Sequence, residues 1–391
     1  MASVLPENNR TAWITAQRPA RTGGQDPFKP HGFFLEEECD HFGRIARSAV
    51  VLLTNKECPW RCLMCDLWQN TLPETVPPGA IPRQIDYALA QLAGATAGGE
   101  AEFSGDQTAL PLPRGGGEGW GEGATADPPA PTNSESPLAL TLSPSAGERE
   151  TNADACRSSH SSLSSANLDQ IKLYNSGSFF DPAAIPLADY AAIAERVAFA
   201  RRVVVESHPR LVGDRTLRLR DLLAGSLEVA MGLETAHPEI LSRLNKKFTL
   251  AHFAEAAKLL RQAGVAVRAF VLVKPPFMSE AEGLEWAVKS AAFAFDCGAE
   301  VVSLIPTRPG NGAMDRLVAA GEFSPPHLAT LESALELAIA LRRGRVFADT
   351  WNLEPFATCA ACFPARRQRL HEINLSQQNR PRVECAVCGK T

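Results

Sequence analysis

Short apolar runs alternate with amphipathic stretches over most of the chain, and this alternation predicts its main elements. Six runs rich in Val, Ile and Leu are predicted to be buried strands, at 49–53, 170–175, 202–207, 227–234, 266–273 and 300–305, with 345–349 as a candidate seventh. Apolar residues recur at helical spacing in 84–93, 185–200, 216–224, 250–263, 281–298 and 327–343. This order favours an α/β fold with a parallel sheet, either open or curled into a barrel.

The pattern breaks down at residues 109–166. Ser, Pro and Gly make up 24 of these 58 residues, and seven Asp/Glu against three Arg give a net charge of −4. Such a segment buries too little apolar surface to offset the entropy cost of ordering it. A helix-to-strand connection also needs only about 2–6 residues. We therefore expect a disordered, low-complexity insertion within the core domain, with a partner-binding tail as the alternative.

The composition is that of an ordinary globular protein. The 391 residues are 45% hydrophobic and 21% charged, and a net charge of −5 gives no overall basic field of the kind that marks many nucleic-acid binders. No signal-peptide pattern and no run of about 18 apolar residues is present, so no membrane association and a cytoplasmic location are expected. Seven of the ten cysteines fall into a triad and two pairs, a grouping typical of metal binding in a reducing compartment.

The triad is Cys58, Cys62 and Cys65, with gaps of three and two residues, directly after the first predicted strand. It therefore lies on a loop at the C-terminal end of a strand, the edge at which α/β folds bind ligands. Three thiolates with no nearby His fit an iron–sulfur cluster with one iron left open. The alternative, a disulfide, is not expected in a cytosolic chain.

The triad spacing resembles the signature of the radical S-adenosylmethionine (SAM) superfamily. The resemblance implies a partial (β/α)6 TIM-like barrel, a [4Fe–4S] cluster on the triad, and SAM on the open iron. It also implies reductive cleavage of SAM to a 5′-deoxyadenosyl radical that abstracts hydrogen from a substrate, with an external electron donor of the flavodoxin or ferredoxin type. The family usually has an aromatic residue before the last cysteine, where this chain has Met64.

The residues that end the predicted strands are candidates for holding the cofactor. Asn175, Ser176 and Gly177 stand where the family has a glycine-rich segment that receives the SAM amino group, and a carboxylate at Glu234 suits a ribose hydroxyl. The complete set of predicted cofactor-binding residues is Met64, Asn175, Ser176, Gly177, Glu206, Glu234, Lys274 and Pro306. The alternative for Glu206 and Glu234 is a salt bridge at the rim, and Lys246 is expected to be solvated. No pair of titratable residues stands out, so no catalytic acid or base is assigned.

Longer strings resemble one branch of the superfamily. The segments 175–182, 232–235, 241–249 and 270–276 are similar to the radical SAM subunit of archaeosine synthase and its uncharacterised bacterial relatives, a group similar to the elongator catalytic subunit. The resemblance implies a modified 7-deazaguanine base in tRNA as substrate and a partner enzyme subunit. Two alternatives stay open: a radical SAM enzyme acting on a small molecule or peptide, and a non-enzymatic, metal-containing RNA-binding protein.

Two Cys-x-x-Cys pairs near the C-terminus, Cys359 with Cys362 and Cys385 with Cys388, predict a four-thiolate metal site. Either Zn²⁺ in a zinc-ribbon-like module or a second iron–sulfur cluster satisfies these ligands. Arg366, Arg367 and Arg369 lie between the pairs and suit either RNA phosphates or a solvated helix face. The predicted organisation is an N-terminal arm (1–32), a core domain (33–356) carrying the 109–166 insertion, and a C-terminal module (357–391).

Overall fold

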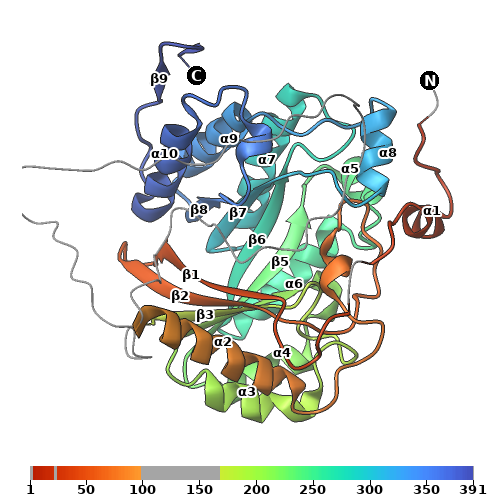
Figure 1. The fold of residues 1–391 in the computed structure, drawn as a ribbon, viewed down its shortest axis with the longest axis vertical. Helices are drawn as coiled ribbons and strands as arrows, with labels where there is room; N and C mark the ends of the chain where they lie inside the picture. The colour runs from red at the N-terminus through yellow and green to blue at the C-terminus, as the bar shows by residue number, and fades with distance from the viewer. Residues whose placement is uncertain (1–2, 22–23, 98–167, 391) are drawn as a thin grey trace, which may run out of the picture. The chain divides into compact units, whose positions relative to one another are not determined.

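The computed structural model describes residues 3–21, 24–97 and 168–390. The insertion predicted at 109–166 lies outside the described residues. The sheet has eight strands in sequential order: β1 (Gly32–Cys39), β2 (Ile45–Leu52), β3 (Gln170–Tyr174), β4 (Arg202–Ser207), β5 (Ser226–Glu234), β6 (Ala266–Val273), β7 (Val301–Pro306) and β8 (Arg345–Ala348). Strands β2 to β8 are parallel, and β1 pairs antiparallel with β2. The fold is thus an open, curled half-barrel, as the sequence predicts (Figure 1).

The helices of the described residues are α1 (Arg10–Ala16), α2 (Ala80–Ala97), α3 (Tyr190–Arg196), α4 (Asp214–Leu222), α5 (Pro238–Arg243), α6 (Leu250–Gln262), α7 (Glu280–Asp296), α8 (Ala313–Ala319), α9 (Leu328–Ala340) and α10 (Phe363–Ser376). Short 3₁₀ segments lie at Leu67–Asn70, Leu187–Asp189, Pro209–Leu211 and Glu354–Phe356. A separate two-stranded hairpin pairs β9 (Glu384–Cys385) with β10 (Gly389–Lys390).

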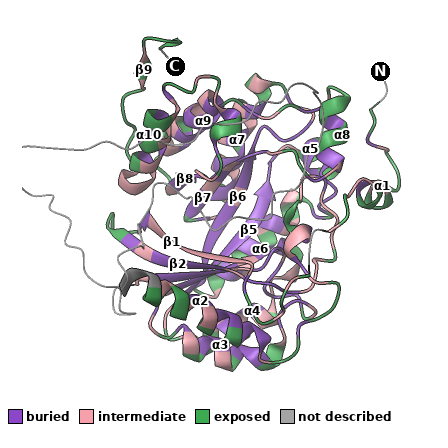
Figure 2. Ribbon diagram, viewed as in Figure 1, coloured by how far each residue is buried: buried purple, intermediate pink, exposed green. Residues whose placement is uncertain are grey.

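The two faces of the sheet differ in chemistry. One face carries Val, Ile, Leu and Ala side chains that pack against the helices in a single large core. The central strands β5 and β6 are mostly buried in Figure 2, whereas β1 is intermediate over most of its length. Residues at the alternating positions point to the inner side of the half-barrel, because successive side chains of a strand face opposite sides. This inner side is polar at many positions, including Lys172, Glu228 and Arg268.

A fully buried ion-pair network occupies the inner side. Arg268 Nη2 lies 2.8 Å from Glu38 Oε1, its Nε lies 2.6 Å from Glu228 Oε1, and Lys172 Nζ lies 2.6 Å from Glu38 Oε2. Each charge therefore has an opposite partner within hydrogen-bond reach, which offsets the cost of removing it from water. Arg202 extends the network, because its Nη1 lies 2.8 Å from Glu228.

Both edges of the half-barrel are covered. The C-terminal helix α10 packs against both β1 and β8. The Asn374 amide pairs with the backbone N–H and C=O of Ala348, both at 2.9 Å, and Gln377 pairs in the same way with Val346, at 2.7 and 3.0 Å. Two side-chain amides thus satisfy backbone groups on the open edge of β8, which would otherwise be free to pair with another chain.

Most predicted elements are confirmed, and the differences have local causes. The antiparallel strand β1 was not predicted, because Glu36, Glu37 and Glu38 hide the apolar pattern of its sequence. The N-terminal arm, expected to be extended, contains α1, whose Ile14 is buried in a second apolar cluster with Leu63, Leu244 and others. Helices α5, α8 and α10 were also missed, and α5 and α8 are too short to show a clear period.

Candidate metal centre and cofactor site

The cysteine triad lies on the loop after β2, at the C-terminal edge of the sheet, as the sequence predicts. All three side chains are half-buried. Backbone hydrogen bonds join the start of this loop to the segment that follows it. Glu57 N donates to Leu72 O and Leu72 N donates to Asn55 O, both at 2.8 Å.

Two asparagines from distant segments, one after β7 and one after α5, hold the same loop. Asn311, after β7, donates through Nδ2 to the carbonyls of Leu63 (2.8 Å) and Cys65 (3.1 Å). Asn245, after α5, donates to the carbonyl of Arg61 at 2.6 Å. The backbone of the triad is therefore fixed by several elements of the sheet, which is what a metal site needs in order to hold its ligands in place.

The electrostatics of the triad suit a bound cation. Burial raises the pKa of the Cys58, Cys62 and Cys65 thiols to about 12, so the free thiols are protonated at neutral pH. A bound metal deprotonates its coordinating thiols, because its charge replaces the lost solvation of the thiolates. Without a metal these thiols are therefore unreactive, and a metal bound here would convert them to thiolate ligands.

The segment after β3 lies directly against the triad. A Cβ built on Gly177 would stand 3.0 Å from Cys58 Cβ and 3.6 Å from its Sγ, so only glycine fits without displacing the cysteine. Glu206 holds this segment, because its Oε1 accepts from the backbone N–H groups of Asn175 (2.5 Å) and Gly177 (3.3 Å). Burial raises the pKa of Glu206, opposed by these bonds. The Glu206 carboxylate is thus hydrogen-bonded to the backbone of the segment after β3.

Asn175 is fully buried, yet neither its Oδ1 nor its Nδ2 has a hydrogen-bond partner among the described residues. Buried side-chain amides are nearly always hydrogen-bonded, so an unpaired one points to a missing polar partner. Thr54 Oγ1 and Asn55 Oδ1, which begin the cysteine loop, are unpaired and buried in the same way. This edge of the sheet therefore offers polar groups that a polar cofactor would satisfy.

Three predicted residues at strand ends adopt left-handed backbone conformations, with φ of +56° at Ser176, +66° at Glu234 and +54° at Lys274. Such conformations are unfavourable for residues with a Cβ and cluster at functional sites. They turn the chain sharply where β3, β5 and β6 end, so that the following residues lie across the C-terminal edge.

Glu234 forms a buried ion pair with Lys246, and Lys246 is only 9% exposed. The expectation that Lys246 is solvated was therefore wrong. Burial alone would lower its pKa, but Glu234, Cys62 and Cys58 raise it overall, so the ammonium stays charged beside the triad. Gly232 leaves room for this pair, since a Cβ there would overlap both Lys246 Nζ and Glu234 Oε1 and would force their side chains to shift.

A stack of rings closes the other side of the cysteine loop. Trp60 lies parallel to His208, with ring centroids 3.8 Å apart and an interplanar angle of 4°. His208 Nδ1 accepts from Arg210 N (3.2 Å), and its Nε2 therefore donates to Lys246 O (2.8 Å). Burial lowers the pKa of His208 to about 3, so the ring is neutral at physiological pH. His208 links the cysteine loop to the Lys246 segment.

The contacts of the remaining predicted residues, Lys274, Met64 and Pro306, are with other parts of the protein. Lys274 Nζ donates to Ser324 O and Oγ, at 2.8 and 2.6 Å, and lies 3.1 Å from Glu280 Oε2. Met64 packs against the second apolar cluster. Pro306 ends β7, five residues before Asn311. Their contact with a cofactor stays a prediction.

The four C-terminal cysteines converge on one point. The sulfur atoms of Cys359, Cys362, Cys385 and Cys388 all lie within 4.8 Å of one another, and those of Cys362 and Cys388 are 3.8 Å apart. A hydrogen bond from the Cys362 backbone lowers the pKa of Cys359 to about 7, which favours the thiolate. This arrangement can bind a metal.

Two of the arginines between the cysteine pairs, Arg366 and Arg369, have a structural role. Arg366 Nη2 lies 2.6 Å from Glu332 Oε2, and both side chains are buried. Arg369 pairs with Glu336 and with the carbonyls of Arg380 and Pro381. The alternatives of RNA contact and of a solvated helix face are therefore both wrong for Arg366 and Arg369. They fasten α10 to α9 instead.

Sequence reasoning gave no role to Asn245 or Trp60 and expected Lys246 to be solvated. It treated His208 as either a hydrogen-bonded loop residue or a proton carrier, and it placed Asn311 in a loop expected to line the adenine or substrate pocket. One signal was available for Asn311, because it stands between Gly310 and Gly312 in a turn-rich loop after a strand. Nothing local marks the other four, whose partners are far away in sequence.

The chain is similar in sequence to known proteins. No family model matches the chain. The chain is 32% identical over 180 residues to the archaeosine synthase subunit beta of Thermococcus kodakarensis, a match that covers 44% of this chain and 54% of that protein. It is 24% identical over 229 residues to an uncharacterized protein of Methanocaldococcus jannaschii, covering 55% of this chain and 62% of that protein. The chain thus matches about half to three-fifths of the length of these relatives. The predicted resemblance to archaeosine synthase subunit beta is confirmed.

Among solved structures, the archaeal Elp3 of Methanocaldococcus infernus, with N-terminal residues 1–46 deleted, aligns with a TM-score of 0.38 at 16% identity. The alignment covers 46% of this chain and 47% of that chain. Within the described ranges, no helix combines the length and the apolar character needed to cross a membrane.

Proposed function

We propose that this chain is a radical SAM enzyme that removes hydrogen from a modified base of the 7-deazaguanine type in tRNA. The observation that carries the radical SAM part is the contact between Gly177 and Cys58, which joins the candidate cofactor segment to the candidate cluster loop. The substrate part is supported by the resemblance to archaeosine synthase subunit beta.

The residues present fit the two cofactors. Cys58, Cys62 and Cys65 would hold a [4Fe–4S] cluster with one open iron. When bound, the cluster and SAM supply a 5′-deoxyadenosyl radical after reduction by an external donor of the flavodoxin or ferredoxin type. The unpaired amide of Asn175 and the backbone of Ser176 and Gly177 would receive polar groups of SAM.

The protein's own residues provide position and shielding. Glu206 fixes the Asn175–Gly177 backbone through two N–H bonds, and Asn311 and Asn245 fix the cysteine loop. Lys246 places a buried positive charge beside Cys58 and Cys62, which stabilises negative charge on the bound ligands. The Trp60–His208 stack limits access of water from one side of the loop. None of these residues is assigned as an acid or base.

For the C-terminal site we propose a single Zn²⁺ ion. Four thiolates at about 2.3 Å from one tetrahedral ion stand about 3.8 Å apart. The Cys362–Cys388 separation of 3.8 Å matches this value, and all four sulfur atoms lie within 4.8 Å. In a [4Fe–4S] cluster each cysteine binds a different iron, so the sulfurs must lie farther apart. This spacing disfavours the small-molecule or peptide alternative that relies on an auxiliary cluster.

The proposal also includes a partner subunit. Archaeosine synthase subunit beta carries a name that implies other subunits. We expect this chain to act with a partner enzyme that prepares the modified base.

The test is a metal analysis followed by an activity assay on anaerobically purified protein. We expect about four iron and one zinc per chain, and production of 5′-deoxyadenosine and methionine from SAM under reducing conditions. Cys58→Ala should abolish both the iron and the cleavage, while Cys297→Ala, at the end of α7, should preserve them. Cys388→Ser should remove the zinc alone.

Three outcomes decide between the alternatives. Absence of iron after reconstitution would refute the radical SAM proposal. About eight iron and no zinc would favour the auxiliary-cluster enzyme. Tight tRNA binding that survives Cys58→Ala, without SAM cleavage by the wild type, would favour the non-enzymatic RNA-binding protein. For the substrate, nucleoside analysis of tRNA carrying the modified base should show a change that requires Cys58.

A further inference from the structure

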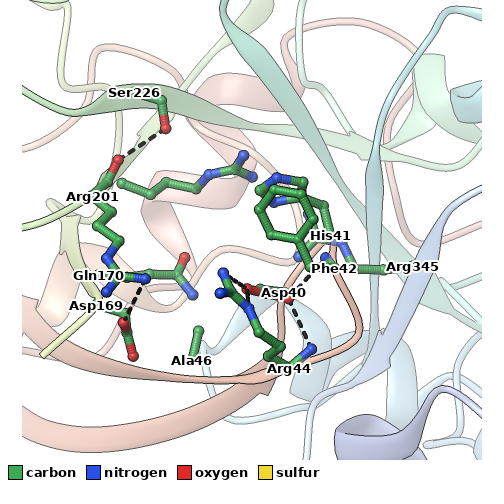
Figure 3. A pocket seen from close by; sticks show the side chains of 11 residues that line it. Asp40, His41, Phe42, Arg44, Ala46, Asp169, Gln170, Arg201, Ser226 and Arg345 are labelled. Carbon is green, nitrogen blue, oxygen red and sulfur yellow. Dashed lines mark hydrogen bonds and ion pairs between the residues drawn. The ribbon is translucent and has the colours of Figure 1, made fainter.

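A cavity lies at the opposite edge of the sheet from the cysteine loop. It has a volume of about 240 Å³ and is formed where β3, β4, β5 and β8 begin, beneath the turn between β1 and β2 (Figure 3). Its charged lining residues are Asp40, Arg44, Asp169, Arg201, Arg202 and Arg345. Four guanidiniums face two carboxylates, so the lining carries a net positive charge.

The carboxylates are already engaged. Asp40 accepts from Phe42 N, from Arg44 N and from the Arg44 guanidinium, at distances between 2.8 and 3.1 Å. Asp169 Oδ2 accepts from Arg47 N at 3.1 Å, and its Oδ1 lies 3.6 Å from Arg201 Nη1. Arg44 is thus neutralised within its own turn, whereas Arg201 has only a long ion pair.

Arg202 and Arg345 also differ in how fully their charge is paired. Arg202 is compensated, since it lies 2.8 Å from Glu228 and 3.8 Å from Glu300. Arg345 Nη1 donates to the Cys39 carbonyl at 2.9 Å, but its Nη2 is buried and has no hydrogen-bond partner in the part of the chain that the structure describes. Burial lowers the pKa of Arg345, while the nearby Glu228 opposes this shift and Arg268 adds to it. Arg345 therefore lines the cavity with a guanidinium whose hydrogen-bonding capacity the protein uses only in part, and such a group favours an anionic ligand.

The rim of the cavity carries exposed aromatic rings. Phe42 is 68% exposed at the tip of the β1–β2 turn, and His41 lies against it with ring centroids 3.7 Å apart. Figure 3 shows both rings beside Arg345 at the cavity. An exposed ring next to a cluster of guanidiniums is the combination that binds nucleotides, the base by stacking and the phosphate by ion pairing.

We propose that this cavity binds the phosphate of a nucleotide, with the base on Phe42. The volume is smaller than the roughly 300–1,000 Å³ of sites that enclose a whole small molecule, so the cavity fits the phosphate and part of its sugar. The ligand is either a free nucleoside monophosphate or the terminal phosphate of an RNA, which present the same chemistry. The site does not depend on the proposed function, because it needs neither cluster nor SAM.

The test is calorimetric binding of uridine 5′-monophosphate to the full-length protein with its metals, because a uracil nucleotide is less prone to enter a site for the adenine of SAM. We expect inorganic phosphate to compete and uridine to bind at least about tenfold more weakly. Arg201→Gln and Arg345→Gln should each weaken binding about tenfold. Phe42→Ala should weaken nucleotide binding more than phosphate binding.

Arg343→Gln is the matched control. Arg343 lies two residues before Arg345, but it pairs with Asp296 at 2.7 Å and does not line the cavity. Arg201 has a side chain that is 73% exposed, so its variant tests the site even if Arg345→Gln lowers the melting temperature. Binding that is absent at millimolar nucleotide, or unchanged in Arg201→Gln, would overturn the proposal.

A pair of short oligouridines, with and without a 5′-phosphate, distinguishes the two sources. Tighter binding of the phosphorylated oligomer than of the mononucleotide supports an RNA end. Weaker binding supports a free nucleotide. Equal binding of the two oligomers would refute recognition of a terminal phosphate.

Discussion

Gly177 packs directly on Cys58, with 3.0 Å between the Cys58 Cβ and the position that a Cβ on residue 177 would occupy. The two residues come from segments that are more than 100 positions apart in the sequence, after β3 and after β2. This contact is where the candidate cofactor segment meets the candidate cluster ligands.

Gly177→Ala is expected to impair cluster binding. The added methyl must displace Cys58, and a metal-bound cysteine cannot move without distorting the cluster. We expect iron occupancy after reconstitution to fall severalfold, while the melting temperature of the metal-free protein changes little. Iron analysis and the visible absorbance of the cluster provide the measurement.

The control is Gly94→Ala, on helix α2, where an added Cβ would meet nothing within 4 Å. This variant should retain wild-type iron and gain slightly in stability, by about 0.4–1 kcal/mol. Equal iron occupancy in Gly177→Ala and the wild type would show that Cys58 can shift freely.

Arg366→Ala should be strongly destabilising. It leaves the buried Glu332 carboxylate without its closest partner, a change that typically costs about 3–5 kcal/mol. Arg382→Ala provides the comparison, because Arg382 is 44% exposed in its pair with Glu336 and its loss should cost at most about 1 kcal/mol. Urea unfolding of both variants measures the difference. Small, equal costs together with weakened tRNA binding would restore the phosphate-contact interpretation of Arg366.

His208 should make stability depend on pH in mildly acidic solution. Its pKa is about 3 in the fold, because of burial, and 6.5 in the unfolded chain. Between these values the unfolded state binds a proton that the native state does not bind. The contribution of His208 to the free energy of unfolding is therefore complete above pH 6.5. It is lost as the pH falls towards 3, by at most about 1.4 kcal/mol per pH unit.

His208→Gln removes this titration but keeps an amide that can bond to Lys246 O. We expect the unfolding free energy of the variant to fall less steeply between pH 6.5 and 4 than that of the wild type. His327→Gln, with a side chain that is 64% exposed, should keep the wild-type slope. Parallel curves for His208→Gln and the wild type would mean that His208 is protonated in the fold.

Asn374→Ala should expose the edge of β8. The N–H and C=O of Ala348 would both lose their partner, which costs about 1–3 kcal/mol for each buried group left unpaired. A free strand edge also pairs with other chains, so light scattering on heating should begin at a lower temperature. Gln368→Ala, on the same helix, removes only an exposed contact to Glu372 and should change neither quantity.

The strands could be predicted well because each is a short apolar run with turn residues at its ends. Runs 202–207 and 266–273 match β4 and β6 at both ends. Strand β1 was missed, because Glu38 is buried only through its pairing with Lys172 and Arg268, which come from strands far along the chain. A local pattern cannot reveal a charge that is neutralised by distant partners.

The candidate site likewise has features that the sequence predicts and features that depend on the tertiary structure. The sequence alone determined the ligand chemistry, because cysteine spacing is local: the triad, the two C-terminal pairs and the glycine at 177 could all be found without a structure. Only the tertiary structure decided what surrounds them. It buried Lys246 against Glu234, used Glu206 to hold the Asn175–Gly177 backbone, and turned Arg366 and Arg369 inward onto α9. The physical reason is that a charge takes its role from the partners and the burial that it finds after folding, and those partners are set by how the strands and helices pack rather than by neighbours in the sequence.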